Sequence, residues 1–266
     1  MRRKPAVAGT FYPAEREDLN KLMDLLCEGS PGEKLNAKGV LVPHAGYVYS
    51  GRTACRVYSR VRIPERVVLL GPNHTGMGAD VSVYSGDVWE TPFGDVEVDG
   101  DLREILLGTG LFKADELAHL YEHSLEVQLP FLLRYAEAPF SILPVVLGHL
   151  DYEKARTLGR FLGEKLKDAP ALIVISSDMS HYINAEEARR KDRILISAME
   201  RLATDELYFK AVQYNITMCG FIPAVVGIEA VKVLGARQGV LIDYTNSGEV
   251  TGDYERVVAY AGMMFV

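Results

Sequence analysis

Three apolar stretches of the sequence are each followed by side chains that can bind a metal or carry a proton. His44 follows the first stretch, His74 the second, and Asp178 and His181 the third. In open α/β sheets, ligands bind beyond the carboxyl ends of the strands, so polar residues at several strand ends converge on one pocket. Neutral imidazoles suit iron, zinc or copper rather than magnesium or calcium. We therefore expect a metal site at the carboxyl edge of a sheet.

Two further segments add candidate donors. His123 and Glu126 stand three residues apart in a segment for which we predict a helix over 121–136, so both would project from its first turn toward the site. The alternative is an exposed pair on a solvated helix face. Cys219 precedes a predicted helix, whose dipole would favour a thiolate. The alternative for Cys219 is a small buried apolar residue.

Asp178 and His181 also suggest proton chemistry. A helical turn beginning at Asp178 would place both side chains on one face. Asp178 would then hold the tautomer of His181 and leave that histidine as a proton carrier near neutral pH. His119 does not follow a strand, and His149 has no glycine-rich turn or polar partner after it, so neither is assigned to the site.

Strands and helices alternate along almost the whole chain and must position these residues. Apolar runs predict strands at 39–43, 66–71, 140–148, 171–176, 239–245 and 255–265. Helical patterns lie at 15–28, 50–60, 121–136, 151–168, 184–203 and 220–235. This order predicts one α/β domain over 1–266, a three-layer α/β/α sandwich around a mainly parallel mixed sheet. We expect a β-hairpin excursion at 81–99, forming a rim over the sheet, and an antiparallel edge at the C-terminus.

Composition narrows the class of protein. Lys and Arg (29) against Asp and Glu (36) give a net charge of −7, the wrong balance for binding nucleic acid. No apolar run approaches the roughly 18 residues that cross a bilayer, so we expect no membrane association and a cytoplasmic location. Cys27, Cys55 and Cys219 are odd in number and widely spaced, which argues against a disulfide framework. Cys27 and Cys55 are predicted to be small buried residues of amphipathic helices.

Six strings give the chain a resemblance to a known family. They are, in order, RRKPAVAGTFYP, VPHAGYVYSG, GPNHTG, EHSLEVQLPFL, SSDMSHY and MCGFIPA. With these strings the chain resembles the Memo family, whose eukaryotic member is named as a mediator of receptor-driven cell motility. It is more distantly similar to the catalytic subunit of class III extradiol dioxygenases, which open catechol rings with non-haem Fe(II) in the same α/β architecture.

The resemblance implies a ligand set. His44, His74 and Cys219 would line or coordinate a metal, with Fe(II) or copper favoured and zinc the remaining candidate. The dioxygenases hold iron with two histidines and a carboxylate, whereas the matching third position here is Cys219. A thiolate changes the potential of iron and is itself oxidised by O₂ chemistry.

The resemblance also implies roles around the metal. Asp178 and His181 would lie beside it, with His181 as acid/base and His123 in contact with substrate. Phe11 and Tyr49 match aromatic positions linked, in the eukaryotic member, to a pocket for phosphotyrosine-containing peptides. Prokaryotic relatives are associated with a radical-SAM protein and an AMMECR-type protein in the AmmeMemoRadiSam system, which implies a functional link.

Several functions fit these residues. The first is a metal-dependent oxidoreductase, and the second is a non-enzymatic module that binds a peptide or a small ligand in the same pocket, which would also include Glu126. A third uses Cys219 as nucleophile with His181 as base and Asp178 as orienter. Metal-assisted hydrolysis is a fourth. The substrate stays open, and so does the choice between a monomer and a homo-oligomer.

Overall fold

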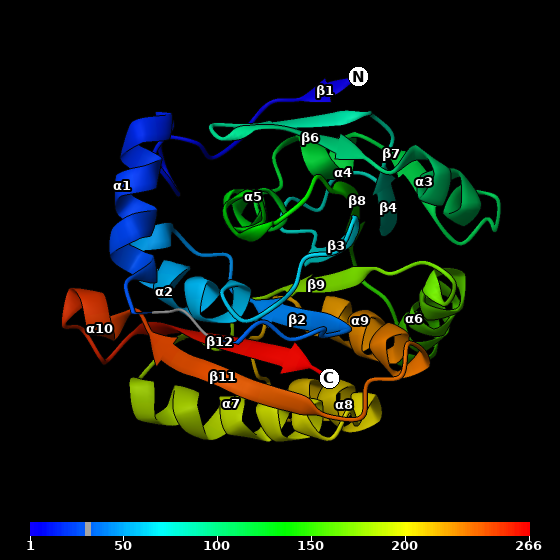
Figure 1. Cartoon of the computed structure of the whole chain (residues 1–266). Coiled ribbons are helices and arrows are strands. Elements are labelled where there is room, and N and C mark those ends of the chain that lie inside the picture. Colours follow the sequence, from blue (N-terminus) through cyan, green and yellow to red (C-terminus); the bar gives the residue numbers. More distant parts are fainter. Residues whose placement is uncertain (30–32) are drawn as a thin grey trace.

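A single mixed sheet forms the centre of the protein (Figure 1). The computed structural model describes residues 1–29 and 33–266. In that part of the chain twelve strands follow the order β1-β5-β6-β8-β3-β9-β2-β12-β10, with β11 beside β12, and β4 beside β7 and β8. The strands are β1 (Arg2–Arg3), β2 (Gly39–Val42), β3 (Arg66–Pro72), β4 (Val81–Tyr84), β5 (Val88–Thr91), β6 (Gly94–Val98), β7 (Lys113–Asp115), β8 (Ser141–Leu147), β9 (Leu172–Ser176), β10 (His181–Ile183), β11 (Gly239–Asn246) and β12 (Val257–Phe265).

The central strands β6, β8, β3, β9 and β2 run parallel to one another. Their carboxyl ends therefore share one edge of the sheet, where β2 ends at Val42, β3 at Pro72 and β9 at Ser176. Every residue of β2 and β9 is buried, as expected for strands covered on both faces. This edge is where the sequence predicts the functional residues.

Helices cover both faces of the sheet. They are α1 (Arg16–Cys27), α2 (Tyr47–Tyr58), α3 (Gly100–Leu107), α4 (Leu117–Leu120), η1 (Glu126–Gln128, a 3₁₀ turn), α5 (Leu129–Tyr135), α6 (Tyr152–Leu166), α7 (Ala185–Glu200), α8 (Thr204–Gln213), α9 (Phe221–Val233) and α10 (Gly248–Thr251). None of the helices in the described parts of the chain is long and apolar enough to cross a membrane.

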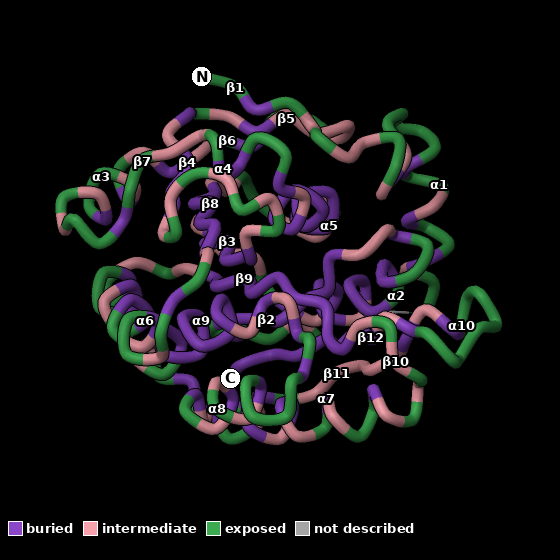
Figure 2. The backbone as a smooth tube through the Cα atoms, turned by 180° about the vertical axis from the view of Figure 1, so that it is seen from behind, coloured by how far each residue is buried: buried purple, intermediate pink, exposed green. Residues whose placement is uncertain are grey.

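Alternating side chains of the strands build two separate cores. In β2, Val40 and Val42 face the core made with α1, α2 and α5, and Leu41 faces the core made with α6, α7, α8 and α9. In β3, Leu69 and Leu70 divide in the same way, because successive residues of a strand point to opposite faces. The buried central strands and α9 stand out in Figure 2. The predicted three-layer α/β/α fold is thus confirmed.

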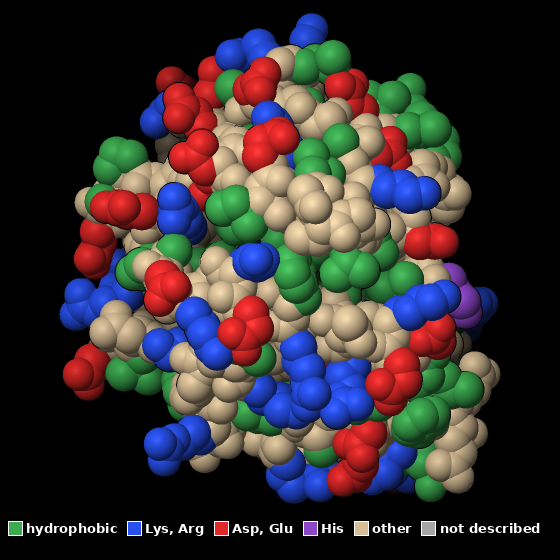
Figure 3. All heavy atoms as spheres, turned by 90° about the vertical axis from the view of Figure 1, so that its right-hand side faces the viewer, with side chains coloured by type: hydrophobic (Ala, Val, Ile, Leu, Met, Phe, Trp, Pro, Cys, Tyr) green, Lys and Arg blue, Asp and Glu red, His purple; other side chains and the backbone are tan. Residues whose placement is uncertain are grey.

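The outer surface mixes charges of both signs. Figure 3 shows acidic and basic side chains interspersed on one side of the molecule, with a group of Lys and Arg in its lower half. Helix α6 lies on this side in Figure 1 and contributes ion pairs such as Arg156–Glu153, 3.2 Å between nitrogen and oxygen. Exposed pairs of this kind add little to stability.

The hairpin and the antiparallel edge occur where the sequence predicts them. Within 81–99, β5 and β6 form an antiparallel pair, but β4 and β6 both pair with β8, so this excursion extends the sheet and is not a rim over it. At the C-terminus, β12 is antiparallel to β10, β11 and β2. Helix α8 was not predicted. It begins after Leu202, whose φ of 55° ends α7.

The helix predicted over 121–136 forms only in its second half, and the helical turn predicted at Asp178 does not form. Regular α-helix begins only at Leu129, because Pro130 fits the first turn of a helix, so His123 lies in a loop and not on a helix face. No helical turn begins at Asp178. The Met179 N–H donates to the Ala259 carbonyl (2.8 Å) and the Ser180 carbonyl accepts from the Ala259 N–H (2.9 Å), so pairing with β12 holds this segment extended.

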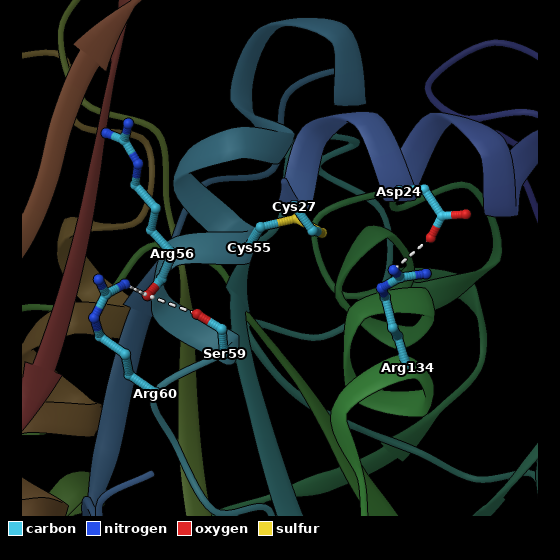
Figure 4. Close-up of a disulfide and its surroundings, with 7 residues drawn as sticks. All are labelled: Asp24, Cys27, Cys55, Arg56, Ser59, Arg60 and Arg134. Atoms are coloured by element: carbon cyan, nitrogen blue, oxygen red, sulfur yellow. Dashed lines mark hydrogen bonds and ion pairs between the residues drawn. A yellow bond between two sulfur atoms is a disulfide. The ribbon is translucent and has the colours of Figure 1, made fainter. Parts of the chain in front are cut away.

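The prediction for two of the cysteines is also wrong. Cys27 in α1 and Cys55 in α2 form a disulfide, with their Cα atoms 5.2 Å apart (Figure 4). The reason is that α1 and α2 pack together on one face of the sheet, which brings the two residues together across a separation of 28 positions. Near the disulfide, Arg134 of α5 donates to Asp24 of α1 at 2.6 Å. Cys219 is free.

Candidate metal centre

Three loops bring imidazoles to one point at the carboxyl edge of the sheet. His44 follows β2, His74 follows β3, and His123 lies between α4 and η1. One potential ligand atom from each of the three side chains lies within 4.8 Å of the others. The ring centres of His44 and His74 are 5.1 Å apart, and those of His74 and His123 are 4.8 Å apart. This group can hold a metal ion.

Two of these imidazoles have a hydrogen-bond partner at Nδ1. The Glu122 carboxylate lies 2.9 Å from Nδ1 of His74 and 3.5 Å from Nδ1 of His123. Nδ1 of His44 lies 2.9 Å from Oγ of Ser176. That hydroxyl donates its own hydrogen to the Ser124 carbonyl at 2.6 Å, so His44 must be the donor at Nδ1. Nε2 of His44 and of His74 is thereby available to a metal, in the manner of metal-binding histidines held by a second partner.

Electrostatics favour neutral imidazoles at His44 and His123 and an anionic carboxylate at Glu122. Burial is the main cause that lowers the pKa of His44 and of His123. Burial raises the pKa of Glu122, but hydrogen bonding from His74 and the Ser124 N–H outweighs it and brings that pKa to about 2. Metal ligands must be unprotonated, so this charge state suits binding.

Cys219 lies next to His44 but outside the group of three imidazoles. Its sulfur is 3.1 Å from Nε2 of His44 and accepts the Asp178 N–H at 3.2 Å. The next residue is Gly220, and any side chain there would clash, because a Cβ would lie 2.5 Å from Cβ of Ser177. Burial, the largest cause, raises the pKa of the Cys219 thiol. The sulfur is therefore a thiol until a metal replaces its proton.

Asp178 and His181 lie at the same edge but do not act as the predicted pair. Asp178 accepts the His44 N–H at 2.8 Å, and burial raises its pKa to about 6. The partner of His181 is Thr217, whose hydroxyl accepts the His181 N–H at 2.8 Å and whose carbonyl accepts from Nδ1 at 2.9 Å. Because a carbonyl only accepts, Nδ1 carries the proton and Nε2 of His181 is the basic atom.

One of the two predicted aromatic positions lies beside the imidazoles. The ring of Phe11 is 4.7 Å from that of His123, and the Phe11 carbonyl accepts the Tyr47 N–H at 2.8 Å. Tyr49 is in the first turn of α2 with 39% of its surface exposed. Phe11 therefore lies against the imidazole group, and Tyr49 presents an exposed ring at the start of the helix that follows His44.

Glu126 organises the N-terminal segment and does not face the imidazoles. It is fully buried and accepts from Arg3 Nη1 (2.8 Å), the Ala6 N–H (2.7 Å), the Val7 N–H (3.0 Å) and the Tyr12 hydroxyl (2.7 Å). Glu126 thus anchors the segment that carries Phe11.

Sequence reasoning missed Glu122, Ser176 and Thr217. Glu122 had a usable signal, since a carboxylate directly before a candidate histidine is a common partner for a metal-binding imidazole. Ser176 and Thr217 are hydroxyl residues near candidate donors, which is too common a pattern to single them out.

The protein is thus an α/β protein with a largely parallel sheet. Its histidine centre lies at the carboxyl edge of that sheet, the usual place for a ligand site in this class. A family model described as Memo-like protein matches residues 3–264. A MEMO1 family protein of Aquifex aeolicus is 69% identical over 264 residues, covering 99% of each chain. Another, of Methanosarcina barkeri, is 42% identical and covers 98% of this chain and 99% of the relative. The chain belongs to the Memo-like family.

A solved structure with low sequence identity shares the fold. The uncharacterized protein JW3007 from Escherichia coli K12 superposes with a TM-score of 0.54 at 12% identity, over 85% of this chain and 99% of that chain. At this identity the likeness concerns the arrangement of the sheet and helices alone.

Proposed function

We propose that the protein is a metal-dependent oxidoreductase whose iron or copper is held by His44, His74 and His123. Cys219 is the fourth candidate donor, since its sulfur lies 3.1 Å from Nε2 of His44. Imidazole and thiolate donors suit iron, copper or zinc, so the residues present fit such a metal. The observation that carries the proposal is the convergence of imidazole ligand atoms within 4.8 Å.

A redox-active metal would supply electron transfer and an open position for a substrate. The protein would supply the proton chemistry. Thr217 holds the Nδ1 proton of His181, so Nε2 of His181 takes a proton from the substrate or returns it. Asp178 accepts the His44 N–H and so fixes the loop that carries this histidine. The Phe11 ring packs against His123 and would help to hold that imidazole in place.

Metal analysis of two histidine variants tests the proposal. Protein purified without oxygen should contain stoichiometric iron or copper, and His44→Ala should lose it because a buried donor is removed. His149→Ala is the matched control, since His149 is an exposed histidine outside the imidazole group, and should keep the metal. Full occupancy in His44→Ala would refute the assignment.

A non-enzymatic module that binds a peptide or small ligand is the second candidate. It is favoured by the exposed ring of Tyr49 at the start of α2 and by the ring of Phe11 against His123. A metal-free protein that binds a partner as tightly as the loaded protein would support it. The metal-free thiol mechanism loses support, because burial raises the pKa of Cys219 and its nearest imidazole is His44, not His181.

A further inference from the structure

Tyr182 has a backbone conformation that bulky residues rarely adopt. Its φ is 61°, in the left-handed region. In the described residues, Leu202 and Asn215 are the other non-glycine residues with positive φ. They directly follow the C-caps of α7 and α8, where a left-handed residue commonly ends a helix. Tyr182 lies within β10, where no helix end accounts for its φ.

A β-bulge causes this conformation. His181 pairs with Val258 and Ile183 pairs with Val257, so Tyr182 is an extra residue between two paired ones. Hydrogen bonds fix both flanks: the His181 N–H donates to the Thr217 hydroxyl at 2.8 Å, and the Ala185 N–H donates to the Tyr254 carbonyl at 2.9 Å. Bulges beside active sites often redirect a side chain.

The redirected ring gains little from packing. Tyr182 is 66% exposed, so the free energy gained by burying its ring is too small to offset the cost of the strained backbone. Its ring centre lies 5.8 Å from the ring of His181, and the guanidinium carbon of Arg256 lies 6.0 Å from it. Tyr182 and Tyr49 are both close enough to the buried Tyr260 to raise its pKa, after the larger effects of burial and of Asp178. The exposed ring of Tyr182 therefore lies beside the imidazole of His181.

We propose that Tyr182 is a specificity-determining residue that contacts the ligand, its ring forming one wall of a slot for a planar aromatic group beside His181. Backbone strain that is not offset by packing of the side chain points to a role in function rather than in folding. An aromatic group would meet the ring in a stacked or edge-to-face arrangement. This inference rests on the proposed function only in taking the ligand to be the substrate of the histidine centre.

Binding of two neutral amides tests the proposal. Benzamide and cyclohexanecarboxamide have the same polar group, but only the first is planar and aromatic. In NMR titrations the protein should bind benzamide about three- to tenfold more tightly. Tyr182→Ala should abolish this preference and Tyr182→Phe should keep it. Tyr214→Ala removes a ring that is 46% exposed after α8 and should change nothing. No binding of benzamide, equal binding of both amides, or a preference that survives Tyr182→Ala would overturn the proposal.

Stability and metal content distinguish a ring that contacts a ligand from a ring that is held for packing. Tyr182→Ala should unfold at nearly the wild-type urea midpoint, and Tyr182→Gly at the same or a higher one, because glycine adopts positive φ without strain. A large loss of stability in Tyr182→Ala would show that the ring is held for packing, which overturns the proposal. All Tyr182 variants should bind metal as the wild type does. A wild-type protein that binds no metal yet prefers benzamide would refute the oxidoreductase and support the aromatic slot.

Discussion

Glu122 accepts hydrogen bonds from two segments that are distant in sequence. Its oxygens take the His74 N–H at 2.6 Å, Nδ1 of His74 at 2.9 Å and the Ser124 N–H at 2.9 Å. The carboxylate also lies 3.5 Å from Nδ1 of His123, so one buried anion lies beside two of the three imidazoles. Such partners raise the basicity of a ligand and fix its direction.

Glu122→Gln is expected to weaken metal binding by about 10- to 100-fold, because the amide lacks the charge and turns a donor toward the imidazoles. Competition with a chelator measures this affinity, and circular dichroism checks the fold. Glu17→Gln, on the exposed side of α1, is the matched control and should bind metal normally. Unchanged affinity in Glu122→Gln would show that the carboxylate does not support the ligands.

Asp192 of α7 is a buried carboxylate that affects stability through pH. It accepts from the Ser180 hydroxyl at 2.6 Å and the Tyr244 hydroxyl at 2.8 Å, yet burial outweighs these bonds and raises its pKa. A raised folded pKa means that protonation favours the folded state. The stability that this group contributes is therefore complete below about pH 4, the unfolded pKa, and is lost as pH rises through the folded pKa.

Asp192→Asn removes this titration, since the amide is neutral at every pH. The free energy of unfolding of the variant, relative to wild type, should rise between pH 4 and pH 7. Urea unfolding of both proteins at the two pH values measures the difference. A constant difference, or one that falls with pH, would contradict the account.

At the scale of elements, the disulfide joins α1 to α2, the helix that follows the loop of His44. It closes a loop of 28 residues between α1 and α2. In the chain-entropy description, a loop of this length stabilises the fold by about 3–4 kcal/mol. Reduction should therefore lower the urea midpoint of unfolding.

Thiol titration of the unfolded protein supplies the direct check. Without a reductant, Cys219 alone should react, and after reduction all three cysteines should react. Three reactive thiols in the unreduced protein would mean that Cys27 and Cys55 are not joined. An unchanged midpoint after complete reduction would mean that the bond adds no stability.

The elements that the sequence predicts well are those with strong local signals. The buried strand β9 is an unbroken apolar run, because helices cover it on both faces. The errors have causes far along the chain. Pairing of Met179 and Ser180 with Ala259 keeps Asp178 off a helix, and no local pattern in the sequence signals that pairing.

The same distinction applies to the site. His44 and His74 follow predicted strands, so topology alone places them together. Glu122 contacts His74 across 48 residues, and Cys27 meets Cys55 across 28, which spacing cannot predict. His123 reaches the imidazole group from a loop rather than from the predicted helix.

At the scale of the whole molecule, the parallel strands and the N-terminal segment work together. Strands β2, β3 and β9 bring two of the histidines to one edge. The guanidinium of Arg3 lies over Trp89 at 4.1 Å, pairs with Glu126 at 2.8 Å and donates to the Glu122 carbonyl at 2.7 Å. The first residues of the chain thus hold the loop that carries His123.

Anomalous diffraction from crystals of protein purified without oxygen, with the energy scanned across the iron, copper and zinc edges, tests the histidine centre most directly. We predict one strong iron or copper peak bounded by the imidazole nitrogens of His44, His74 and His123, with the Cys219 sulfur beside it. A metal-free centre in such protein, or a metal bound at other residues, would contradict the account.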